Sequence, residues 1–151
     1  MSSAIASQDR PSPAHLMLYH KQSTSARTRF LRLPHGGICG PAALPPDAAL
    51  DDGVSGAVPA SLLTHPAMLL RDAESALSLP RGSLEADSGF RCRIIAAGEA
   101  ADVHLAHFTS IDPPFEAAEA IGARFIDLTQ ARGLPATELS LLRLAYEHVL
   151  G

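Results

Sequence analysis

The clearest pattern of apolar positions lies at the C-terminal end of the chain. From Pro135 onward, Leu139, Leu142, Tyr146 and Val149 recur three or four residues apart, which is the spacing of one helix face. Pro135 suits the first turn of a helix, where a missing N–H costs no internal hydrogen bond. The pattern predicts an amphipathic helix from Pro135 to the end of the sequence, with its apolar stripe against a core.

A second helix is predicted to begin just after Asp112, but its end has two interpretations. Asp112 can accept hydrogen bonds from the first free N–H groups of that helix. Gly122 costs about 1 kcal/mol relative to alanine inside a helix, yet glycine is favoured just past a helix end. We prefer a continuous helix to Arg132; in the alternative, the helix stops at Ile121 and residues 124–128 form a short strand.

Alternation of apolar and polar positions predicts four strands in two adjacent pairs. Residues 15–20 and 27–33 fit a hairpin with a polar loop. Residues 90–96 and 102–110 fit a second antiparallel pair that turns at 97–101. Strands that come in adjacent pairs argue against repeated strand–helix–strand units.

Three other segments carry weaker patterns. Residues 1–13 are small, polar and rich in proline, so we expect a flexible N-terminal arm. Residues 34–58 are dominated by Gly, Pro, Ala and Asp without periodicity, which predicts a long loop. Helical spacing appears over 59–79 and is broken at Pro66.

These elements predict an α+β fold. The expected arrangement is an antiparallel or mixed sheet of about four to five strands with helices packed on one face. With 151 residues, the chain is long enough to bury roughly two thirds of its unfolded surface. We expect a single domain over residues 14–151.

Composition narrows the classes of partner and the cellular location. The formal net charge is −4 and basic residues do not cluster, so nucleic acid is not an expected partner. No apolar run approaches the ~20 residues of a membrane helix, and the N-terminus lacks the features of a signal peptide. We therefore expect a cytoplasmic protein with reduced cysteines. Abundant Ala, Arg, Gly and Pro, with a single lysine, indicate a GC-rich bacterial genome.

His35 and Cys39 form the most suggestive chemical cluster, because both lie in a glycine-rich turn. Either a nucleophilic or a metal-ligating cysteine needs a thiolate, hence a nearby cation or helix N-terminus, and the sequence places neither beside Cys39. The nearest match to a nucleophile elbow, residues 53–57, has no strand before its serine. His35 and Cys39 are thus weak candidates for catalytic residues.

Asp102 and His104 are the weak candidates for metal ligands. On a strand they share one face, whereas His107 points to the other. Arg91 and Arg93 also share a strand face, where a surface ion pair with a cross-strand carboxylate is expected. The chain contains no G-x-G-x-x-G, C-x-x-C or H-E-x-x-H motif, and no cofactor is identified.

Our leading hypothesis from the sequence is a non-catalytic binding or accessory module that acts through protein or small-ligand contacts, as a homodimer. The alternative is a small enzyme or metal-binding protein. Its site would be built from the loop 34–58 and the strand 102–107, with His35, Cys39 and His104 converging in one pocket. A binding module would instead leave these residues scattered and expose an apolar patch.

Overall fold

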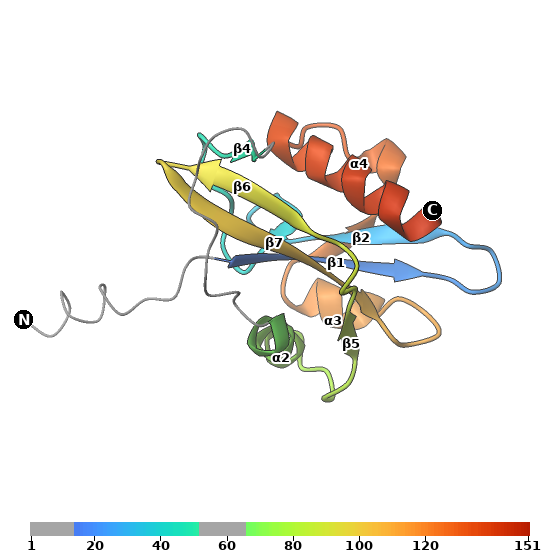
Figure 1. Cartoon of the computed structure of the whole chain (residues 1–151). Helices are drawn as coiled ribbons and strands as arrows, with labels where there is room; N and C mark the ends of the chain where they lie inside the picture. The colour runs from blue at the N-terminus through green and yellow to red at the C-terminus, as the bar shows by residue number, and fades with distance from the viewer. Residues whose placement is uncertain (1–13, 52–65) are drawn as a thin grey trace, which may run out of the picture.

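A computed structural model describes residues 14–51 and 66–151, and within them the chain forms a mixed eight-stranded sheet (Figure 1). The strand order is β4-β6-β7-β1-β2-β8, with β3 also paired to β1 and β5 to β7. The strands are β1 (Ala14–Lys21), β2 (Thr28–Arg32), β3 (Cys39–Gly40), β4 (Ala49–Leu50), β5 (Leu84–Ala86), β6 (Cys92–Ala96), β7 (Glu99–Phe108) and β8 (Arg124–Ile126). The α+β class with a mixed sheet is thus confirmed.

The four predicted strands form the centre of this sheet. β1 and β2 make the expected antiparallel hairpin, and β6 and β7 make the second antiparallel pair. The two pairs are joined by β1 and β7, which run parallel. The strand count exceeds the predicted four to five because β3, β4, β5 and β8 have only two or three residues each, too few to show alternation.

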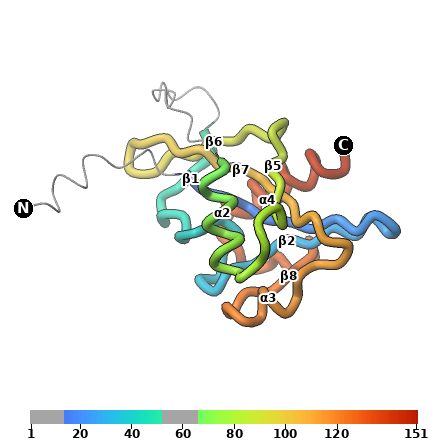
Figure 2. The backbone as a smooth tube through the Cα atoms, turned by 90° about the horizontal axis from the view of Figure 1, so that it is seen from below, coloured from blue at the N-terminus to red at the C-terminus, as the bar shows by residue number. Residues whose placement is uncertain are grey.

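Helices cover both faces of the sheet, so the prediction of helices on one face is wrong (Figure 1). On β1, Met17 and Tyr19 face a core that includes Leu141 and Leu142 of α4 (Ala136–Leu150). The other face of β1 packs against α2 (Pro66–Ala76) and α3 (Phe115–Ala120), and Figure 2 shows α2 in front of the strands on that side. The sequence already carried the signal, because residues 16–19 form an unbroken apolar run, as in a strand covered on both faces, and residues 15–20 are all buried in the structure.

The preferred continuous helix to Arg132 is also wrong, because the chain leaves the helical conformation at Gly122. This residue has a positive φ of 81°, which costs glycine little. The N–H groups of Gly122 and Ala123 donate to the carbonyl oxygens of Glu119 and Ala118 at 3.0 and 2.9 Å, the pattern of a Schellman C-cap. β8 then pairs with β2, and a short 3₁₀ helix, η1 (Leu128–Gln130), follows.

The C-terminal helix matches its prediction, and α2 begins at the proline where a break was expected. The predicted arm at 1–13, the last part of the long loop, the elbow-like motif 53–57 and the helical pattern before Pro66 lie outside the described residues. In the part of the chain that is described, no helix is long and apolar enough to cross a membrane.

Candidate functional site

The two catalytic candidates from the sequence occupy different environments. His35 is exposed in the turn after β2, where its Nδ1 accepts a hydrogen bond from the Gly37 N–H at 3.1 Å. Cys39 lies in β3 and is fully buried. Burial raises the pKa of the Cys39 thiol, and the nearby Glu138 carboxylate raises it further. Cys39 is therefore held as a neutral thiol, the form that is a poor nucleophile and a poor metal ligand.

Cys39 and His104 lie on opposite faces of the sheet. Cys39 stands opposite Met17 in the antiparallel β1–β3 pair, on the face covered by α4. His104 stands beside Leu16 in the parallel β1–β7 pair, and Leu16 belongs to the core on the α2 side. The two side chains point away from each other, so the geometry does not support a site shared by His35, Cys39 and His104.

The metal candidates Asp102 and His104 do share one face of β7, as predicted. Asp102 is engaged by Arg93 of β6, whose Nε lies 3.3 Å from Asp102 Oδ1, so the expected cross-strand ion pair is confirmed for Arg93, whereas Arg91 lies just before β6. Within residues 14–51 and 66–151, no group of three or more His, Cys, Asp or Glu side chains is arranged to hold a metal ion.

A polar cluster that the sequence did not reveal forms around Asp87, in the loop after β5. Tyr19 donates its hydroxyl hydrogen to Asp87 Oδ2 at 2.5 Å, and His107 Nδ1 lies 2.6 Å from Oδ1. His148 of α4 approaches the same carboxylate, with its Nε2 3.7 Å from Oδ2. On the outer side, His107 Nε2 lies 3.6 Å from Glu85 Oε1. One carboxylate therefore ties a loop to β1, β7 and α4.

The chemistry of this cluster favours a structural role. The Asp87 side chain is only 10% exposed, so its hydrogen bonds are shielded from water. Burial, followed by the hydrogen bond to Asp87, raises the pKa of Tyr19, which keeps the phenol neutral and able to donate. We infer that the cluster holds α4 against the sheet. No local motif could have revealed it, because its members are spread over the chain.

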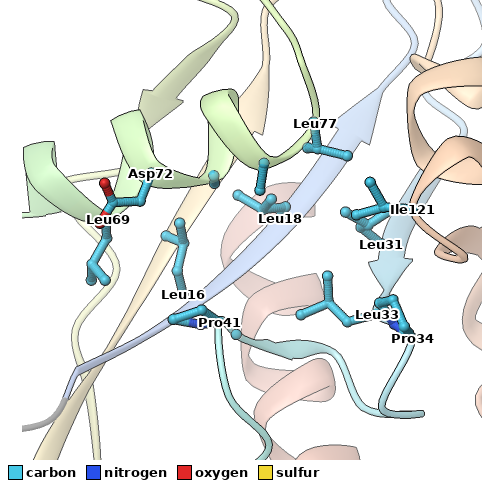
Figure 3. A pocket seen from close by; sticks show the side chains of 13 residues that line it. Leu16, Leu18, Leu31, Leu33, Pro34, Pro41, Leu69, Asp72, Leu77 and Ile121 are labelled. Atoms are coloured by element: carbon cyan, nitrogen blue, oxygen red, sulfur yellow. The ribbon is translucent and has the colours of Figure 1, made fainter.

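A cavity of about 190 Å³ lies between α2 and the sheet (Figure 3). Its walls come from β1, from β2 and the segment after it, from β3 and the residue after it, from α2 and the residue after it, and from the residue after α3. The lining residues are Leu16, Leu18, Leu31, Leu33, Pro34, Gly40, Pro41, Leu69, Asp72, Ala73, Ala76, Leu77 and Ile121. All but Asp72 are apolar or glycine, so the cavity offers an apolar surface with one carboxylate.

Small side chains on α2 leave this space open. Leu70 of α2 and Leu77 just after it are buried in the core, whereas Ala73 and Ala76 line the cavity with a single methyl group each. The helix is held over the sheet by buried Glu74, whose Oε2 accepts hydrogen bonds from the N–H groups of Gly82 and Leu84 at 2.9 and 3.0 Å. The cavity therefore lies between anchored elements.

Gly40 shapes the opposite wall. A Cβ atom at this position would lie 2.5 Å from Leu33 Cδ1, so glycine leaves room for the Leu33 side chain in its present position over β3. Pro41 follows through a cis peptide bond. Both Leu33 and Pro41 contribute to the cavity wall.

The sequence did not reveal the cavity. Alanines in a helical segment indicate good helix formers, and nothing in the sequence shows that their small side chains leave a space against the sheet. Comparison of the sequence with protein-family models and with curated proteins finds no match.

Proposed function

We propose that the protein is a non-catalytic module that binds a small apolar ligand in the cavity beneath α2. The observation that carries this proposal is a cavity of about 190 Å³ whose lining is apolar except for Asp72. Protein interiors are normally packed with few voids larger than a water molecule. An apolar cavity of this size offers water few hydrogen-bond partners, whereas an apolar guest gains dispersion contacts with the walls.

The volume limits the size of the ligand. An enclosed apolar cavity of about 150 Å³ is enough to hold benzene. The present cavity is slightly larger, so it fits a guest of roughly six to ten non-hydrogen atoms on the same scale.

The alternative of a small enzyme receives less support from the described residues. Within residues 14–51 and 66–151, no histidine, cysteine, serine or lysine lines the cavity, and catalysis of acid–base or nucleophilic type needs such groups beside the substrate. The sequence-based candidates do not converge, and the Asp87 cluster lines a different part of the fold.

Benzene is the probe that tests the proposal. In a methyl-resolved ¹H–¹³C NMR titration, we expect shifts in the leucine and isoleucine methyls of the lining, such as Leu18, Leu31 and Ile121. The methyls of Leu141 and Leu142, which pack on the other face of the sheet, serve as internal controls. Specific binding should also raise the melting temperature in a saturable way. Absence of methyl shifts near benzene saturation would refute the proposal.

Self-association and a cytoplasmic location remain parts of the proposal that follow from the sequence. Leu144 and Leu150 of α4 are 40% and 59% exposed, which gives an apolar contribution to a dimer contact. Light scattering coupled to size exclusion at micromolar concentrations tests this part. A monomer at every concentration would remove the homodimer and leave the ligand proposal standing.

A further inference from the structure

Among the described residues that line the cavity, Asp72 is the one that carries a charge, and we infer from it that the ligand carries a cationic head on an apolar body, as a small aralkyl or alkyl amine does. This inference rests on the proposed function, because it concerns the same cavity. It adds the chemical class of the ligand and the direction in which the ligand lies.

The Asp72 carboxylate is available for a ligand. Asp72 is exposed on α2 and makes no hydrogen bond or ion pair with any residue in the described ranges. Many other carboxylates in this part of the protein are engaged: Glu74 holds backbone N–H groups, Asp102 pairs with Arg93, and Asp87 binds Tyr19. A ligand cation at Asp72 therefore displaces no protein partner.

The position of Asp72 sets the orientation of the ligand. In Figure 3, Asp72 and Leu69 lie toward one end of the cavity, whereas Leu31 and Ile121 lie toward the other. An ammonium group at Asp72 stays near solvent, and the hydrocarbon part extends over β1 toward Leu31. This placement avoids burying the charge, which would be strongly unfavourable without full pairing.

The charge of the lining disfavours the opposite class of ligand. In the part of the chain that the structure describes, no Arg, Lys or His lines the cavity, so a carboxylate or phosphate head would face Asp72 without a compensating cation from these residues. Neutral ligands fit the hydrocarbon wall but gain nothing from the carboxylate. The expected order of affinity is amine, then neutral isostere, then anion.

Benzylamine, benzyl alcohol and benzoate test this order, because they place different heads on the same ring. Dissociation constants come from methyl NMR titrations at neutral pH and low ionic strength. Because Asp72 is exposed, we expect benzylamine to bind about fivefold more tightly than benzyl alcohol, the upper range for an exposed ion pair. In the Asp72→Asn variant this preference should fall to about one, with benzyl alcohol affinity unchanged, and added salt should weaken it in the wild type.

A matched control is Asp112→Asn, which removes an exposed carboxylate that does not line the cavity. This variant should keep the preference for the amine. If benzyl alcohol binds the cavity but benzylamine is no tighter, or if Asp72→Asn keeps the preference, the amine inference is overturned and the apolar cavity function stands. If neither compound shifts the methyls of the lining, both proposals fall.

Discussion

Replacement of Ala73 by leucine should stabilise the protein and block its cavity at the same time. Ala73 projects from α2 into the cavity of about 190 Å³. If the three added carbon atoms fill this space, each contributes about 0.8 kcal/mol of apolar burial. The ordered leucine side chain loses about 0.5–1 kcal/mol of rotamer entropy. The net gain is about 1.5 kcal/mol, which corresponds to about 3–6 °C in melting temperature for a chain of this size.

Urea denaturation and a benzene titration measure the two consequences on the same sample. Ala73→Leu should shift the urea midpoint upward without a change in slope, and it should abolish benzene-induced methyl shifts. Ser75→Leu is the matched control, because Ser75 is an exposed residue of the same helix and does not line the cavity. Its stability should stay within about 0.5 kcal/mol of the wild type, with benzene binding intact.

An Ala73→Leu variant that is destabilised by more than about 1 kcal/mol would contradict the free volume beside Ala73, because this is the result expected of overpacking. A stabilised variant that binds benzene as well as the wild type does would contradict the assignment of the cavity as the benzene site. In that event, benzene would occupy a different part of the protein.

Four other predictions test separate parts of the structure. Glu138→Ala should cost about 1–3 kcal/mol, because the buried N–H of Ile38 loses its carboxylate acceptor at 2.7 Å; Glu138→Gln, which keeps an oxygen acceptor, should cost less by urea denaturation. Cys39 should resist a thiol-specific reagent at pH 8 and react in urea, since burial raises its pKa; fast labelling of the folded protein would contradict its burial. In a Tyr146→Phe variant, which leaves Tyr19 as the single tyrosine, absorbance at 295 nm should show ionisation well above the usual pKa near 10, and folding stability should fall as pH rises past 10, because the unfolded chain releases this proton first. Gly122→Ala should cost about 1–2 kcal/mol for its left-handed backbone, and an unchanged urea midpoint would exclude that conformation.

Elements set by local periodicity were predictable from the sequence. The stripe of Leu139, Leu142 and Tyr146 located α4 because a helix face repeats within a few residues. The two hairpins followed from alternation on either side of a short polar loop. In both examples the information lies within one segment and needs no knowledge of distant partners.

Elements that depend on distant partners were harder to predict. Gly122 is compatible with a helix interior and with a helix end, and the pairing of β8 with β2 decides between them. The same holds for β3 and β5, which form strands by pairing with the parts of β1 and β7 that β2 and β6 leave unpaired. Their own residues carry no strand pattern.

The candidate site was less predictable than the fold. His35 and Cys39 were candidates because histidine and cysteine can act in catalysis, yet Cys39 is a buried core residue. The cavity depends on the small side chains of Ala73 and Ala76 and on Gly40, and its walls come from five separate stretches of the chain, 16–18, 31–34, 40–41, 69–77 and 121. Such a site is created by packing and leaves no motif in the sequence.

The parallel pair of β1 and β7 has a consequence for biosynthesis. Ala14 of β1 is in register with Asp102 of β7, so β1 leaves the ribosome roughly ninety residues before its partner, a delay of about 5–20 s at ordinary elongation rates. During this interval, the apolar side chains of Leu16, Leu18 and Leu31 are not yet covered by both α2 and β7. A nascent chain stalled before β7 therefore exposes the apolar surface of the β1–β2 hairpin, the kind of surface that chaperones bind.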